Sequence, residues 1–168
     1  RLKNYPEETF LNRKMAIDLS YIKSSKTIQT ILVNYFIIGL LVGILIPLLL
    51  PYTIEVLNGG EKEYGFIMFA FGLGGLIGGI VSDKISHKVP SNKLLLITFF
   101  TEICMMFIWL QFSQLVMSAF ILFLWGATVF IRLPSQFNFI SETVPTEHLP
   151  QVHSMLQISF VIPNMIAG

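Results

Sequence analysis

Two charged residues within the apolar part of the chain, Glu102 and Arg132, are the strongest candidates for chemistry. Burying an ionisable side chain in hydrocarbon costs at least about 2.5 kcal/mol, so such residues mark candidate functional sites. A carboxyl group in these surroundings can bind and release a proton near neutral pH, and a guanidinium group can meet an anionic or polar substrate. Asn34 and Gln136 add amide groups within apolar segments, where an amide either joins such a site or forms packing contacts and hydrogen bonds between helices. We therefore predict that Glu102, Arg132, Asn34 and Gln136 line a pathway for a proton or a substrate.

The depth of the two charges depends on the helices that carry them. Glu102 is eight residues after Leu94, the predicted start of a span, which places it about 12 Å from that end at about 1.5 Å per residue. Arg132 is about 28 Å along its helix when measured from Ser113, but about 12 Å inside when measured back from Ile140. Several alternatives therefore stay open. For Arg132 there are three: its side chain extends to the membrane border, it faces a cavity, or it pairs with Glu102. For Glu102 there are two: it binds a proton, or it has a structural role.

The composition predicts the kind of element that positions these residues. Hydrophobic residues make up 54% of the chain and charged residues 12%, whereas a soluble domain has roughly 25% charged residues. A soluble globule could not bury this much apolar surface. The single cysteine, Cys104, excludes a disulfide framework and a CxxC metal site. We therefore expect an all-α integral membrane protein, with no cofactor and no metal.

Apolar runs of about 20 residues, the length that crosses the hydrocarbon as a helix, divide the chain into spans. The sequence predicts about four complete transmembrane helices and the start of a fifth, at residues 30–52, 64–82, 94–112, 115–140 and 152–168. Because the last apolar run is cut short and the first residue is not methionine, we expect the sequence to be part of a longer protein.

Residues 1–29 are polar and basic and precede the first span. Pro6 suits the first turn of a helix, because a proline lacks an amide hydrogen that this turn does not need. Apolar residues then recur at steps of three and four residues, namely Leu11, Met15, Leu19 and Ile22. This pattern predicts a linker with an amphipathic helix at the membrane surface.

Basic residues predict the orientation, because short loops rich in Lys and Arg stay in the cytoplasm. Residues 1–29 contain six Lys and Arg residues and the predicted loop 83–93 contains three, whereas only Lys62 lies on the opposite side. We therefore expect a multi-pass protein of the cell membrane with residues 1–29, 83–93 and 141–151 in the cytoplasm.

Glycines gather in the second predicted span, and four of them are spaced by one helical turn. Small residues at this spacing let helix backbones approach closely in lipid. A dinucleotide-binding fingerprint is excluded because Ile77 occupies its third glycine position and no strand precedes it. The residues that we expect in close helix packing are Gly74, Gly75, Gly78 and Gly79.

The end of that span resembles the loop motif of the major facilitator superfamily, with Gly79, Asp83, Lys84 and Lys88 at matching positions. Ser86 stands where the family usually has glycine, and His87 replaces a basic residue. The resemblance implies that Asp83 helps to latch one cytoplasmic conformation. The order of the spans, and the loop 144–152, are similar to the second half of macrolide-efflux-type permeases in that superfamily. Residues 30–168 would then be a partial C-terminal transmembrane half.

The resemblance implies a secondary active transporter that works by alternating access, with efflux of a drug-like or small amphipathic compound. The expected partners are the lipid bilayer, a small-molecule substrate, H⁺ as coupling ion and a missing N-terminal half, but no nucleic acid. A membrane-embedded enzyme is an alternative, although His87, His148 and His153 all lie in or beside loops and no HExxH motif occurs. A non-transporting receptor or assembly subunit is another. Of these we favour a transporter that is not an enzyme.

Overall fold

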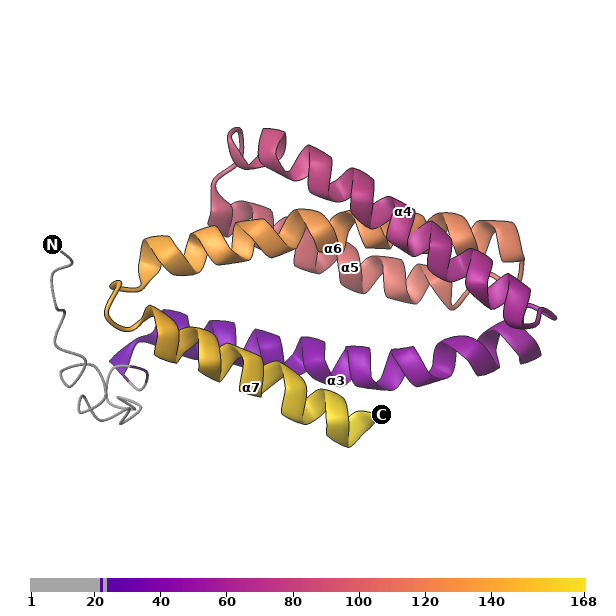
Figure 1. Cartoon of the computed structure of the whole chain (residues 1–168), viewed down its shortest axis with the longest axis horizontal. Helices are drawn as coiled ribbons and strands as arrows, with labels where there is room; N and C mark the ends of the chain where they lie inside the picture. The colour runs from indigo at the N-terminus through magenta and orange to yellow at the C-terminus, as the bar shows by residue number, and fades with distance from the viewer. Residues whose placement is uncertain (1–21, 23) are drawn as a thin grey trace, which may run out of the picture.

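The computed structural model describes Ile22 and residues 24–168, which form a bundle of long helices (Figure 1). The predicted surface helix within residues 1–29 therefore lies almost entirely outside the described residues. The helices are α3 (Lys26–Glu55), α4 (Glu61–Ser86), α5 (Ser91–Trp109), α6 (Leu115–Thr143) and α7 (Leu149–Ala167).

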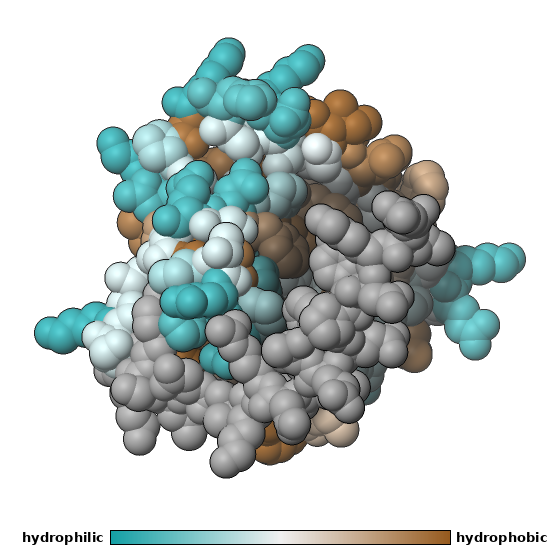
Figure 2. Space-filling model, turned by 60° about the vertical axis from the view of Figure 1, so that its left-hand side comes forward, coloured by the Kyte–Doolittle hydropathy of each residue, from teal (hydrophilic) through white to brown (hydrophobic). Residues whose placement is uncertain are grey.

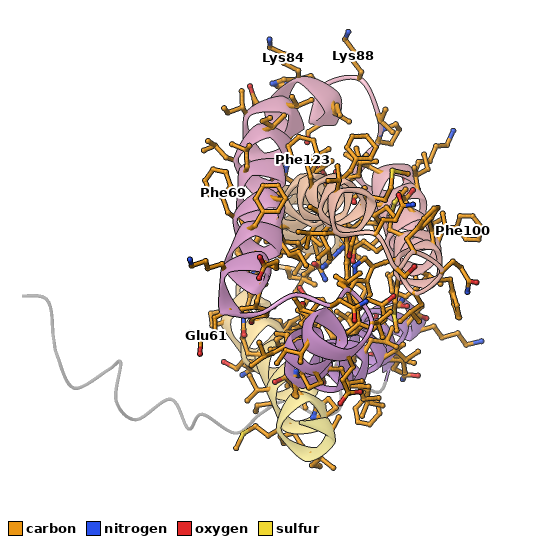
Figure 3. The ribbon with its side chains drawn as sticks, turned by 90° about the vertical axis from the view of Figure 1, so that its right-hand side faces the viewer. Glu61, Phe69, Lys84, Lys88, Phe100 and Phe123 are labelled. Carbon is orange, nitrogen blue, oxygen red and sulfur yellow. The ribbon has the colours of Figure 1, made fainter. Side chains whose placement is uncertain are left out.

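Helices α3, α4, α5 and α6 are each long and apolar enough to cross a membrane. Many large apolar side chains on them are exposed, as expected for surfaces that face lipid. Phe69 and Phe100, for example, point away from the bundle in Figure 3 and are 66% and 69% exposed. The prediction of an all-α membrane protein with four complete spans is confirmed.

The helices extend further than the predicted spans, because hydropathy detects only their apolar parts. Polar residues continue α4 through Asp83 to Ser86, and α6 continues through Pro134 to Thr143. The predicted loop 83–93 is therefore reduced to residues 87–90, and the loop 141–151 to residues 144–148. The C-terminal end of the third span was predicted too late, because α5 ends at Trp109 and not at residue 112.

Local hydrogen bonds explain several helix ends. The Ser25 hydroxyl accepts a hydrogen bond from the backbone of Ile28 at the start of α3, and Glu63 accepts one from the Gly60 amide at the start of α4. At the C-terminal end of α5, the Tyr52 hydroxyl lies within hydrogen-bond distance of the carbonyl groups of Trp109, Leu110 and Phe112, and the shortest distance is 3.2 Å, to Phe112. These contacts satisfy backbone groups that a helix end leaves free.

The helices form two groups. Helices α4 and α5 both pack along α6, and α3 packs along α7. Figure 1 shows the α3–α7 pair lying beside the α4–α5–α6 group, with α3 joined to α4 at one end and α6 joined to α7 at the other. The space between the two groups is where a cavity can form.

The two ends of the bundle differ in charge. We call the end with the loops 87–90 and 144–148 the basic end, because Lys26, Lys84 and Lys88 lie there. Hydrophilic residues gather at this end, which Figure 2 brings forward. The opposite end carries the loops 56–60 and 110–114.

Two buried apolar clusters connect the groups near these ends. Near the basic end, Ile28 of α3 packs with Ile140 of α6 and Leu156 of α7. Near the opposite end, Leu49 of α3 packs with Trp109 and Leu122, and Trp109 donates a hydrogen bond to Ser118. The region between the two clusters contains the buried charges.

Candidate functional site

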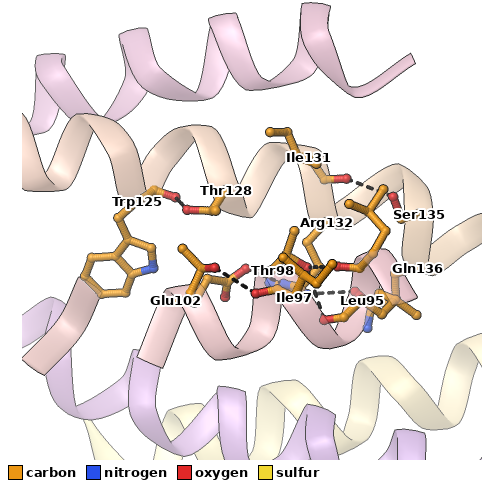
Figure 4. A network of polar contacts seen from close by, with 12 residues as sticks. Leu95, Ile97, Thr98, Glu102, Trp125, Thr128, Ile131, Arg132, Ser135 and Gln136 are labelled. Atoms are coloured by element: carbon orange, nitrogen blue, oxygen red, sulfur yellow. Dashed lines mark hydrogen bonds and ion pairs between the residues drawn. The ribbon is translucent and has the colours of Figure 1, made fainter. Parts of the chain in front are cut away.

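Arg132 of α6 and Glu102 of α5 form a buried ion pair in the middle of the bundle (Figure 4). The Nε atom of Arg132 donates to Oε1 of Glu102 at 2.6 Å, and its Nη1 atom donates to Oε1 of Gln136 at 2.7 Å. The residues are only 9% (Glu102) and 7% (Arg132 and Gln136) exposed. Three of the four predicted pathway residues therefore form one hydrogen-bonded network.

The pair forms because its two residues lie at the same depth on antiparallel neighbours. Glu102 is eleven residues after the first residue of α5, and Arg132 is eleven residues before the last residue of α6. Both are therefore about 16 Å from the basic end at about 1.5 Å per residue. Because α6 continues through Pro134, Arg132 lies well inside the bundle. Of the alternatives that the sequence left open, the structure has Arg132 both paired with Glu102 and facing a cavity.

The cavity lies between the two helix groups and has a volume of about 410 Å³. This volume is within the range of pockets that bind small molecules. Glu102, Arg132 and Gln136 line it together with two further polar residues, Tyr35 of α3 and Gln157 of α7. The other lining residues are apolar or aromatic, and they come from four of the helices.

Asn34 lies apart from the main cavity. Its side-chain amide donates to the Thr30 carbonyl of its own helix at 3.0 Å. It borders a smaller cavity of about 90 Å³ that Arg132 and Gln136 also line. Arg132 and Gln136 therefore separate the main cavity from this smaller one.

The predicted glycine contact joins α4 to α6. A Cβ atom added at Gly74 would overlap the carbonyl of Phe123, and one added at Gly78 would overlap that of Ala127. Gly75 lies against the ring of Phe130, and a Cβ atom added at Gly75 would be 2.7–3.2 Å from three ring carbons. Gly79 differs from the expectation, because no atom of the described residues lies within 4 Å of a Cβ added there. Gly79 is on the outward side of α4, where a glycine makes no close contact with α6.

A second close helix contact was missed at the sequence level. Gly39 of α3 lies against the Phe160 carbonyl, and a Cβ added at Gly43 would be 2.5 Å from the carbonyl oxygen of Asn164. Gly39 and Gly43 are four residues apart, which is the spacing that should have indicated this contact. Glycines that lie against backbone thus hold α3 to α7 and α4 to α6.

Asp83, Lys84 and Lys88 lie at the basic end, away from the cavity. Asp83 belongs to the last turns of α4 and not to a loop, and its carboxylate is 3.6 Å from Nε2 of His87. The side chains of both are at least 80% exposed. Lys84 and Lys88 project from the same end in Figure 3. The loop motif is therefore available at the surface of the described chain.

Potential metal ligands do not gather in the described part of the chain. No three His, Cys, Asp or Glu side chains within it are close enough together to hold a metal ion. Cys104 is half-buried on α5. The chemistry of the described site is therefore that of an ion pair and amides beside an apolar cavity.

Comparisons with known proteins agree with this architecture. A sequence model of the Major Facilitator Superfamily matches residues 2–168, which is nearly the whole chain. No curated protein matched the chain, and neither did any solved structure. The family match, the four membrane-spanning helices and the helical bundle together identify a multi-pass membrane protein. The chain belongs to the Major Facilitator Superfamily, whose members transport small molecules across membranes.

Proposed function

We propose that the protein is a secondary active transporter that uses a proton gradient to export a small amphipathic compound. The observation that carries this proposal is the cavity of about 410 Å³ that holds the Glu102–Arg132 pair between two helix groups. Its apolar lining suits the body of such a compound, and its polar residues supply hydrogen bonds. Export as the proposed direction comes from the resemblance of the loop 144–152 to macrolide-efflux-type permeases, from whose usual loop residues Leu149, Pro150 and Gln151 depart.

Glu102 is the residue that we assign to proton coupling. A carboxylate that accepts a hydrogen bond from Arg132 at 2.6 Å loses this charged contact when it takes up a proton. The protonated state then leaves the Arg132 charge without its partner in apolar surroundings, which is unfavourable. Proton binding therefore gives the cavity between the two helix groups a net positive charge, and this change favours one conformation of the transporter over another.

The division into two helix groups supports alternating access. Glycine contacts hold α3 to α7 and α4 to α6, whereas mainly side chains and a cavity separate the groups. Transporters of this kind place their substrate site near the middle of the membrane, and the Glu102–Arg132 pair lies in the middle of the bundle. We propose that a further set of helices completes the protein and that Asp83 at the basic end latches one conformation on the cytoplasmic side.

Transport assays test the proposal on the full-length protein. Cells that produce it should accumulate less of at least one amphipathic fluorescent compound than cells with an empty vector. Collapse of the proton gradient by an uncoupler should abolish the difference, and Glu102→Gln should abolish it at equal membrane abundance. Export that persists without a proton gradient would reject the coupling, and an absence of export for a broad panel of compounds would reject the efflux function.

A further inference from the structure

The Arg132–Gln136 network offers more hydrogen-bond donors than it uses. An arginine side chain has five N–H groups and a glutamine amide has two. Arg132 uses one to Glu102 and one to Gln136. No buried side-chain nitrogen or oxygen in the described residues lacks a partner. The Nη2 atom of Arg132 and the Nε2 atom of Gln136 make no hydrogen bond within the described residues, so neither atom is fully buried. Both atoms are therefore accessible from the cavities that these residues line.

The net charge of the cavity restricts its ligand further. Glu102 and Arg132 are the charged residues among those that line it, and their charges cancel. A cationic or anionic ligand would add an unpaired charge to largely apolar surroundings, which costs several kcal/mol. A neutral ligand avoids this cost. The surplus of donors favours a ligand that presents a hydrogen-bond acceptor.

The polar lining residues all lie toward one end of the cavity, where apolar residues such as Phe137 accompany them, whereas the other end is lined by apolar and aromatic residues alone. Tyr35 on α3 and Arg132 on α6 lie toward the basic end of their helices. Leu49 on α3 and Trp125 on α6 lie further toward the opposite end. A ligand with one polar and one apolar end therefore fits the cavity in one orientation.

We propose that the cavity binds a neutral amphipathic molecule through a hydrogen-bond acceptor, such as a ketone or amide oxygen, directed at Arg132 and Gln136. The apolar body of the molecule lies between Leu49 and Trp125. This inference rests on the proposed transport function, and it narrows the substrate class and gives the bound molecule an orientation.

Four probes that share a biphenyl body test the proposal by direct binding. They are 4-acetylbiphenyl (neutral acceptor), 4-ethylbiphenyl (no acceptor), biphenyl-4-carboxylate (anion) and 4-(aminomethyl)biphenyl (cation). Radiolabelled probes are measured against purified full-length protein in lipid nanodiscs, with empty nanodiscs subtracted. We expect the ketone to bind about tenfold more tightly than the ethyl compound, because it adds a hydrogen bond to a charged donor. Both charged probes should bind more weakly than the ketone.

Charge variants make the test specific to this cavity. Arg132→Gln leaves a net negative cavity, so the amine should become the tightest of the four probes. Glu102→Gln leaves a net positive cavity, so the carboxylate should become the tightest. The double variant restores neutrality, and we expect the ketone to lose most of its advantage over the ethyl compound because the guanidinium donors are gone. Lys93→Gln, an exposed charge change outside the cavity, should leave the order unchanged.

The outcomes separate this inference from the proposed function. An order led by the amine or the carboxylate in the unaltered protein would overturn it, as would an order that the cavity variants leave unchanged. If the single variants do not fold, Arg132→Lys keeps the charge and should keep the ketone ahead of both charged probes. The predicted binding order without transport of any probe would reject the transport function alone.

Discussion

Helix α6 packs closely against α4, but a cavity lies between α6 and α3. Against α4, glycines let backbone meet backbone, so that even an added methyl group would overlap the Phe123 carbonyl at Gly74. Against α3, side chains keep the helices apart, and between them lies a cavity of about 410 Å³. The first contact is close, whereas the cavity beside the second is lined by the ion pair that Arg132 of α6 makes with Glu102 of α5. Rigid association and ligand space are thus assigned to different faces of one helix.

The difference has a physical basis in the membrane. Lipid tails are as apolar as leucine, so helices associate there through close packing and not through exclusion of water. A face with glycines gains the most from such packing. A face with bulky and charged side chains gains less, and its polar groups need partners or solvent.

The largest effect is expected from breaking the glycine contact. Gly74→Leu would force a side chain into the backbone of α6, and we expect a loss of stability of more than about 3 kcal/mol and little folded protein. The measurement is the fraction of monodisperse full-length protein in detergent. Leu76→Phe enlarges an exposed side chain of the same helix and should change this fraction little. Equal effects of the two variants would show that α4 and α6 are not in close contact.

The next effect concerns the ion pair on the other face. Glu102→Gln leaves the Arg132 charge buried without its partner, which should destabilise the protein by about 3 kcal/mol. The double change of Glu102→Gln with Arg132→Gln should recover part of this loss. Thermal unfolding of the single and double variants gives the coupling between the residues. Losses that simply add would contradict the pairing.

A smaller effect is expected at the contact of α3 with α7. Gly43→Ala adds a methyl group 2.5 Å from the Asn164 carbonyl oxygen, and a small shift of α7 can relieve the overlap. We expect a loss of about 1–3 kcal/mol in unfolding experiments. Ile44→Ala, at an exposed position of the same helix, is the matched control. If Gly43→Ala lost no more stability than Ile44→Ala, the close contact between α3 and α7 would be contradicted.

The smallest effect on stability is expected at Asp83. Its side chain is 85% exposed, so Asp83→Asn should leave the unfolding midpoint unchanged. If Asp83 latches one conformation, transport should fall at least twofold at equal membrane abundance. Glu61→Gln, an exposed change at the opposite end, should not reduce transport. Unaltered transport by Asp83→Asn would reject the latch.

The sequence was sufficient to predict the transmembrane helices but not the contacts between them. Apolar runs predicted four spans because helix length and hydropathy are local properties. The Glu102–Arg132 pair stayed open because the depth of Arg132 measured from Ser113 disagreed with the depth measured from Ile140, and only tertiary packing places α6 relative to α5. Gly39 and Gly43 were missed within a long apolar run, where spacing alone does not say which face meets a neighbour. For the same reason Gly79 was expected in a contact that it does not make.

The lengths of the helices have a consequence for how the bundle fits its membrane. Helix α5 has 19 residues and is about 28 Å long, whereas α3 with 30 residues is about 45 Å long. In a hydrocarbon layer of about 30 Å, α3 must tilt or project, while α5 has no spare length. A thicker bilayer can be matched by α3 through a smaller tilt, but not by α5. The position of Glu102 relative to the membrane surface is thus set by a helix with no spare length, and lipid chain length becomes a variable that acts on the buried charge.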